Sequence, residues 1–153
     1  MGFSVIIPAR YASSRLPAKL LRDINGKSLI EHTYSNAVRS DASRVIIATD
    51  DKRIKTIAEG FGAEVCMTSD SHTSGTSRIS EVVSALDFQD DDVIVNLQGD
   101  EPMMSPVAIN QVASNLVSSQ MSVATLCEAI ATKEEYFDEN CVKVVYNSRG
   151  KAM

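Results

Sequence analysis

The sequence predicts an α/β fold in which helices cover both faces of a mostly parallel central sheet. Two mainly apolar runs, Val5–Ile7 and Arg44–Thr49, are typical of strands that are buried on both faces. Strand-like runs alternate with stretches of helical period, and the connections between them are short. With 153 residues, of which 44% are hydrophobic, the chain can bury a sizeable core, and residues 1–153 suit one compact domain.

The first elements can be placed from their boundary signals. Pro8 ends the first strand because it lacks a backbone donor, and residues 23–26 are typical of a turn. Apolar positions three and four residues apart predict a helix at Lys27–Arg39. Asp50 and Asp51 follow the second strand, where capping of the next helix is favoured over ligand binding at the sheet edge.

The second half of the chain continues the alternation. Ser105 can cap a helix that Pro106 begins, and Thr132 with Glu135 resembles a capping box. The pattern predicts strands at Glu64–Met67, Val93–Leu97, Met121–Leu126 and Cys141–Tyr146, and a helix at Arg78–Leu86. Thr76 or Ser77 as a simple cap of this helix is the alternative to a ligand-binding role of the preceding loop.

Composition excludes several classes of function. The net charge of -5 argues against a nucleic-acid binder, which would show a basic stripe. No apolar run approaches the roughly 20 residues needed to cross a bilayer, and the N-terminus lacks the features of a signal peptide. Cys66, Cys127 and Cys141 form no C-x-x-C pair and are expected to be buried thiols in strands. We therefore expect a cytoplasmic protein without membrane insertion.

The loop after the first strand carries three cations, Arg10, Arg15 and Lys19, with no acidic residue between them. Ligands of open α/β sheets bind beyond the carboxyl ends of the strands, where this loop lies. A buried core would not tolerate this net charge, so the cations are either solvated or bound to an anion. Charge and position alone leave both alternatives open. If the cations bind an anion, the loop is predicted to be a polyphosphate site.

A polar loop before the third helical stretch is a second candidate. Ser74, Gly75 and Thr76 can bring backbone and hydroxyl groups close to a polar ligand. Arg78 lies at the start of the predicted helix, where the helix dipole disfavours a cation, so it requires an anion or a base edge nearby. Simple helix capping by the hydroxyl residues is the alternative.

The strand ending at Leu97 presents Gln98, Asp100 and Glu101 at its carboxyl end. A carboxylate there would repel phosphates held by the Arg10 loop unless a divalent cation lay between them. We therefore predict that Asp100 binds Mg²⁺, with Glu101 either sharing the metal or pointing away. A structural turn stiffened by Gly99 and Pro102 is the alternative.

Three segments together resemble the 3-deoxy-manno-octulosonate (Kdo) cytidylyltransferases, or CMP-Kdo synthetases. They are PARYASSRLPAKLL, EVCMTSDSHTSGTSR and VNLQGDEP, and the resemblance extends over essentially the whole chain. It implies a Rossmann-like nucleotidyltransferase fold, CTP and Kdo as substrates, Mg²⁺, and a role in lipopolysaccharide core biosynthesis in the bacterial cytoplasm.

The resemblance also implies roles for individual residues. Arg10, Arg15 and Lys19 would hold the CTP phosphates, Ser74, Gly75 and Arg78 would line the nucleotide pocket, Gln98 would contact the nucleotide or sugar, and Asp100 would bind Mg²⁺. The anomeric hydroxyl of Kdo would then attack the α-phosphorus of CTP and release pyrophosphate. These are the expected catalytic and substrate-binding residues.

The chain departs from the family pattern in sequence and in length. Ala18 and Leu20 replace a glycine and a proline, and Ser77 replaces an acidic residue. Ala18 costs little if its φ is negative. Family members are longer, and their later portion supplies most Kdo contacts, a second metal-binding aspartate and the interface of the expected homodimer, so the fold is expected to be truncated at its C-terminus.

Two alternatives to Kdo activation remain at this point. One is a cytidylyltransferase for another acidic sugar, such as an amino-Kdo or a sialic acid, because sugar choice lies in the portion that this chain lacks. The other is a CTP-binding fragment that is inactive without that portion.

Overall fold

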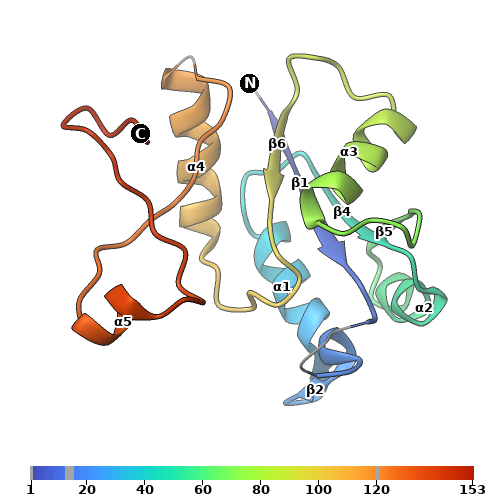
Figure 1. Cartoon of the computed structure of the whole chain (residues 1–153). Helices are drawn as coiled ribbons and strands as arrows, with labels where there is room; N and C mark the ends of the chain where they lie inside the picture. Colours follow the sequence, from blue (N-terminus) through green and yellow to red (C-terminus); the bar gives the residue numbers. More distant parts are fainter. Residues whose placement is uncertain (1, 13–15, 120) are drawn as a thin grey trace.

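The computed structural model describes residues 2–12, 16–119 and 121–153. In this described part a four-stranded parallel sheet, in the order β5-β4-β1-β6, forms the centre (Figure 1). The strands are β1 (Phe3–Ala9), β4 (Arg44–Thr49), β5 (Glu64–Met67) and β6 (Val93–Asn96). The predicted parallel sheet is confirmed, and three of its strands have the expected position to within about one residue at each end.

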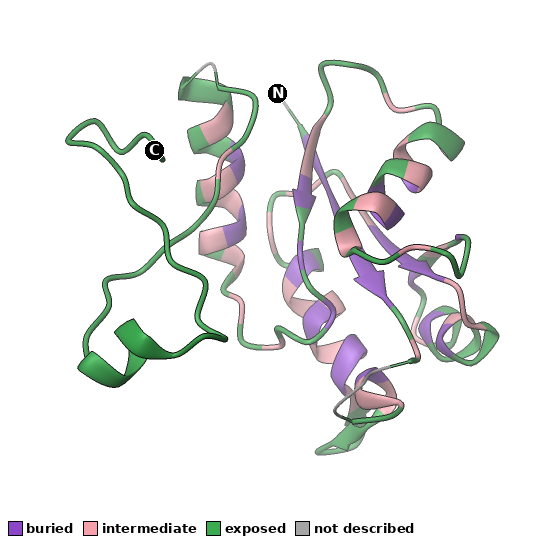
Figure 2. Ribbon diagram, in the orientation of Figure 1, coloured by how far each residue is buried: buried purple, intermediate pink, exposed green. Residues whose placement is uncertain are grey.

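Helices cover both faces of the sheet, as predicted. α1 (Leu29–Val38), α2 (Lys52–Gly60) and α4 (Pro106–Ser119) pack on one face, and α3 (Gly75–Ala85) packs on the other (Figure 2). Because successive side chains of a strand point to opposite faces, β1 contributes to both cores. One core contains Val5, Ile7, Ile30, Ile54 and Ile109, and the other contains Ile6, Ile46, Ile79 and Val82.

Successive strands are added to the sheet first on one side of β1 and then on the other. β4 and β5 extend the sheet on one side of β1, whereas β6 pairs with the other side, where Val5 lies opposite Val95. This is the topological switch point at which open α/β sheets bind ligands. The loops that leave the carboxyl ends of β1 and β6 therefore border the expected binding crevice.

A short hairpin follows the loop after β1. A 3-10 turn at Lys19–Leu21 leads into β2 (Asp23–Ile24) and β3 (Lys27–Ser28). The two turn residues between these strands, Asn25 and Gly26, have φ values of 54° and 83°, which only a few residue types adopt readily. The turn predicted at residues 23–26 is confirmed.

Side-chain caps set where the helices begin. Ser28 accepts a hydrogen bond from the Glu31 N–H, so α1 begins at Leu29 rather than at Lys27. Asp51 accepts from the Arg53 N–H at 2.8 Å and caps α2, which confirms the capping prediction for this aspartate. Ser74 caps α3, which begins at Gly75 and not at Arg78. The alternative in which Thr76 or Ser77 caps this helix is not observed, because Ser74 is the cap.

Residues 121–153, here called the C-terminal arm, contain α5 (Lys133–Phe137) with the predicted capping box of Thr132 and Glu135. All of the arm is exposed except Ala124, which is half-buried (Figure 2). The strands predicted at Met121–Leu126 and Cys141–Tyr146 are absent from the described structure, where an isolated bridge joins Tyr146 to Ala152. A strand needs a pairing neighbour, and among the described residues the arm pairs only with itself, through this bridge.

The cysteine prediction was correct for one residue out of three. Cys66 lies half-buried in β5, whereas Cys127 and Cys141 are exposed in the arm and lie outside strands. Both exposed cysteines fall where the predicted strands did not form. In the described residues, no helix combines the length and the hydropathy that crossing a bilayer requires.

We predict that Ile46→Ala lowers the free energy of unfolding by about 2–5 kcal/mol, because it empties a fully buried site beneath α3. The matched control is Ile57→Ala on α2, whose side chain is 39% exposed and whose loss should cost less than about 1 kcal/mol. Urea denaturation monitored by circular dichroism compares the two. Equal losses would contradict the two-sided core.

Candidate functional site

An open cleft of about 430 Å³ lies at the switch point. Its wall combines the end of β1, the loop before α3 and the loop after β6. The lining residues are Pro8, Ala9, Arg10, His72, Thr73, Ser74, Gly75, Arg78 and Gln98. Five predicted site residues, far apart in the sequence, thus meet at one cleft.

Two glycines allow the walls of the cleft to approach β1. A Cβ atom on Gly75 would lie 3.0 Å from Pro8 Cγ and 3.3 Å from Gln98 Nε2. A Cβ atom on Gly99 would lie 3.1 Å from the Pro8 carbonyl oxygen and 3.2 Å from Leu20 Cδ1. All four distances are shorter than most Cβ contacts, so a side chain at either position would make its neighbours shift, and glycine favours this close packing.

The Ser74 hydroxyl is engaged at the start of α3. It accepts a hydrogen bond from the Ser77 N–H at 3.1 Å and donates to Ser77 Oγ at 3.1 Å. Ser77 donates in turn to the Ser74 carbonyl at 3.0 Å. The two hydroxyl groups therefore form a local network at the start of α3.

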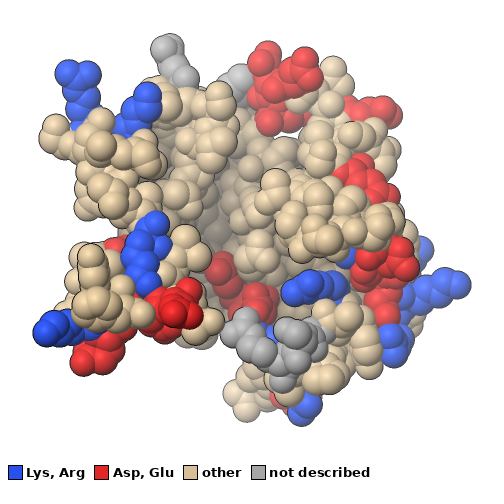
Figure 3. Space-filling view, in the orientation of Figure 1, with Lys and Arg blue, Asp and Glu red and all other residues tan. Residues whose placement is uncertain are grey.

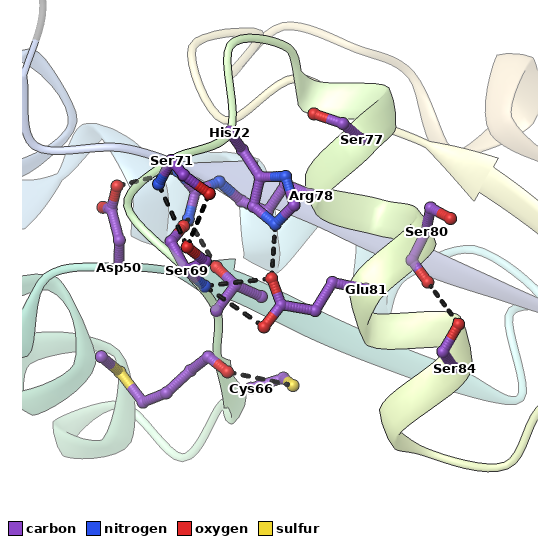
Figure 4. A network of polar contacts seen from close by, with 12 residues as sticks. Asp50, Cys66, Ser69, Ser71, His72, Ser77, Arg78, Ser80, Glu81 and Ser84 are labelled. Atoms are coloured by element: carbon purple, nitrogen blue, oxygen red, sulfur yellow. Dashed lines mark hydrogen bonds and ion pairs between the residues drawn. The ribbon is translucent and has the colours of Figure 1, made fainter.

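Arg78 lines the cleft, but its charge is directed into the protein. Its side chain is 4% exposed and contacts Asp50 at 2.8 Å, as Figure 4 shows. The guanidinium also donates to Thr68 Oγ1 and to the Ser69 carbonyl. The prediction that this arginine needs a nearby anion is confirmed, and the anion is Asp50, a residue for which the sequence favoured capping.

Sequence reasoning did not identify His72 and Glu81. His72 lines the cleft, and its Nε2 atom contacts Glu81 of α3 (Figure 4). The hydrogen bond from His72, followed by that from the Ser69 N–H, lowers the pKa of the Glu81 carboxyl. The available signal was spacing, because Glu81 follows Arg78 by three residues and so shares its helix face.

Lys19 and Asp100 form an ion pair between the loops after β1 and β6. Lys19 Nζ lies 2.5 Å from Asp100 Oδ2, and the two side chains are 38% and 43% exposed. The sequence placed this carboxylate at the same crevice as the loop cations, with phosphate and Mg²⁺ between them, whereas the described structure has a direct contact. Burial, followed by the charge of Asp100, raises the pKa of the adjacent Glu101.

Figure 3 shows acidic side chains at the lower end of a hollow between the C-terminal arm and the sheet.

Arg10 and Arg15 are the other two cations predicted in the loop after β1. Arg10 is exposed in the cleft wall, so its charge is open to solvent or to an anion. Arg15 lies outside the described residues.

The two loop departures have opposite structural consequences. Ala18 has a φ of 55°, in the left-handed region that favours glycine. Alanine was expected to cost little stability only if this φ were negative, and that condition is not met. Leu20 is only 8% exposed and belongs to the core beside Gly99.

We predict that Asp50→Asn lowers the free energy of unfolding by about 2 kcal/mol, because it leaves the buried Arg78 charge without a counterion. Asp51→Asn is the matched control. Its partner Arg53 is 59% exposed, and asparagine caps helices well, so the loss should stay below about 1 kcal/mol. Urea denaturation of both variants decides the point, and a smaller loss for Asp50→Asn than for Asp51→Asn would refute it.

We predict that Ala18→Gly raises the free energy of unfolding by about 1 kcal/mol, because glycine adopts the observed φ of 55° without steric strain. Ala108→Gly in α4 should have the opposite effect and lower it by a similar amount, about 1 kcal/mol. Thermal and urea unfolding measure both. A destabilised Ala18→Gly variant would show that alanine is not strained there.

Comparisons with known proteins agree with this geometry. The family model described as cytidylyltransferase matches residues 4–153. The chain is 65% identical over its whole length to a 3-deoxy-manno-octulosonate cytidylyltransferase of Ruthia magnifica subsp. Calyptogena magnifica, of which it spans 63%. It is 54% identical to 3-deoxy-manno-octulosonate cytidylyltransferase 1 of Actinobacillus pleuropneumoniae serotype 5b, of which it spans 61%.

A solved structure is also similar throughout. The structure of CMP:2-keto-3-deoxy-manno-octonic acid synthetase complexed with CTP matches with a TM-score of 0.92 and 40% identity. The match covers 100% of this chain and 63% of that one, so the chain spans less than two thirds of the relatives it resembles. Because the family model matches residues 4–153, the chain belongs to the cytidylyltransferase family.

Proposed function

We propose that this chain forms the nucleotide-binding part of an enzyme that transfers a cytidylyl group from CTP to Kdo, giving CMP-Kdo and pyrophosphate. The observation that carries the proposal is the cleft between β1 and β6, with a basic residue in its wall and the Lys19–Asp100 pair on the two bordering loops. The similar solved protein is complexed with CTP, and the curated relatives are named for Kdo.

The cleft offers different chemistry to the two ends of a nucleotide. Ser74, Gly75 and Gln98 present hydroxyl, backbone and amide groups, which suit a sugar or base. Arg10 and Lys19 supply positive charge on the loop after β1, which suits phosphate oxygens. We assign Arg15 the same role by its position in this loop.

The residues near Asp100 fit a magnesium site that substrate phosphates complete. Among the described residues no group of three or more histidine, cysteine and acidic side chains could hold a metal ion. Mg²⁺ commonly binds through one or two carboxylates together with phosphate oxygens and water, and Asp100 with the neighbouring Glu101 offers such a set. When bound, the ion would neutralise phosphate charge and polarise the α-phosphoryl group.

The reaction is a direct displacement at phosphorus. The anomeric hydroxyl oxygen of Kdo forms a bond to the α-phosphorus and loses its proton, while the bond from that phosphorus to the bridging oxygen breaks. Pyrophosphate leaves with the electron pair of that bond. Arg10 and Lys19 offset the charge that grows on the leaving group, and the cleft walls orient the nucleotide.

The wider role follows from the same family likeness. We propose that the complete protein acts in the bacterial cytoplasm, supplies lipopolysaccharide core biosynthesis and forms a homodimer. One alternative is that the present chain, which spans 63% of the relatives' length, binds CTP but needs a further portion for turnover. A different acidic sugar, such as an amino-Kdo or a sialic acid, is the other.

The test compares this chain with a version extended to the relatives' length. Isothermal titration with CTP and Mg²⁺ measures nucleotide binding, and pyrophosphate release with Kdo, an amino-Kdo or a sialic acid measures turnover and sugar choice. Binding by both forms, with Kdo-dependent release by the extended one, supports the proposal. No CTP binding by either form would refute it.

We predict that Asp100→Asn in the extended protein abolishes turnover and weakens Mn²⁺ binding in the presence of CTP by about tenfold or more, because an amide carries no charge to hold the metal. Its circular dichroism spectrum should be unchanged, since the Asp100 side chain is 43% exposed. Mn²⁺ binding is read by electron paramagnetic resonance. The control is Asp90→Asn in the exposed turn before β6, and magnesium-dependent activity near that of this control would refute the assignment.

A further inference from the structure

Two oppositely charged residues of α3 hold the backbone of one residue of the cleft rim, Ser69. The rim loop is Thr68–Ser74, which connects β5 to α3. Arg78 donates to the Ser69 carbonyl at 3.3 Å, while the Ser69 N–H donates to the two carboxylate oxygens of Glu81 at 3.2 and 3.0 Å. Residues three apart lie on one helix face, so both contacts come from the same side of α3.

Glu81 also determines the state of the His72 ring. The carboxylate can only accept a hydrogen bond, so the His72 Nε2 atom that contacts it must carry a proton. In the neutral ring Nδ1 is then an acceptor. His72 lines the cleft with a side chain that is 17% exposed, whereas Glu81 is not one of the lining residues.

The burial of these groups separates their roles. Arg78 is buried and paired with Asp50, which ties the rim loop to the end of β4. The Glu81 side chain is 37% exposed, so its removal leaves no buried charge and lets water reach the Ser69 N–H. A change at Glu81 therefore alters the rim loop and the His72 ring more than the fold.

We propose that Glu81 is a positioning residue for the nucleotide, which holds the rim loop and fixes the orientation and tautomer of His72 in the cleft wall. The proposal rests on the proposed use of CTP and assigns part of the CTP affinity to a residue outside the cleft. Glu81 acts through His72 and Ser69, both of which it contacts directly.

The experiment uses Glu81→Ala and Glu81→Gln, with Glu59→Ala as the matched control. Glu59 is an exposed helical glutamate of α2 that pairs with Lys55 four residues earlier. Titration with CTP and Mg²⁺ measures affinity, ¹⁵N NMR reports the protonated nitrogen of each histidine ring, and hydrogen exchange reports the Ser69 amide. His32, whose Nε2 contacts the Ile24 carbonyl, is the internal reference for the ring signals.

Glu81→Ala is expected to weaken CTP binding about tenfold and to speed exchange of the Ser69 amide, because the charged acceptor is gone. Its unfolding free energy should match that of Glu59→Ala. Glu81→Gln is expected to retain slow exchange, since its amide oxygen accepts from Ser69. The same oxygen, at the position of Oε2, also accepts from His72, so the ring proton should stay on Nε2.

The outcomes distinguish this proposal from the proposed function. If the unaltered chain binds no CTP, the proposed function fails and the nucleotide role of Glu81 fails with it. If CTP binds but Glu81→Ala has the affinity of Glu59→Ala, the positioning role alone is overturned. A Glu81→Gln variant that keeps the His72 Nε2 proton and slow Ser69 exchange, yet binds CTP as weakly as Glu81→Ala, also overturns it.

Discussion

The pairing of β6 with the free side of β1 is the constraint on which the candidate site depends. Because β4 and β5 occupy the other side, the connections after β1 and β6 diverge at the carboxyl edge of the sheet and leave a crevice there. Gly75 and Gly99 then allow α3 and the loop after β6 to close on Pro8. The cleft is therefore a product of strand order first and of local sequence second.

Ion pairs within the chain divide the predicted cations into two kinds. Lys19 and Asp100 form an exposed pair, and such pairs contribute little to stability, so a phosphate or a metal can replace either partner at small cost. Arg78 is buried against Asp50, where separation would leave an uncompensated charge. The first pair is suited to exchange with a ligand, and the second keeps the rim loop in place.

The C-terminal arm shows how far local pattern can mislead. Val142, Val144 and Val145 give the segment a strand-like composition, yet they are exposed and unpaired in the described sheet. β-propensity expresses the fit of a side chain to a half-buried pleated surface, which a neighbouring strand must provide. α5 forms nevertheless, because the hydrogen bonds of its capping box lie within the segment itself.

The sequence by itself determined the parallel sheet, the helices and the gathering of Arg10, Ser74, Gly75, Arg78 and Gln98 at one cleft. Apolar periodicity and strand-end position are local signals, and the family motifs strengthened them. Only the tertiary structure decided that Arg78 faces Asp50, that Ala18 has a positive φ and that Glu81 holds His72. Contacts between distant residues and the backbone angle of a loop depend on packing, which no local pattern encodes.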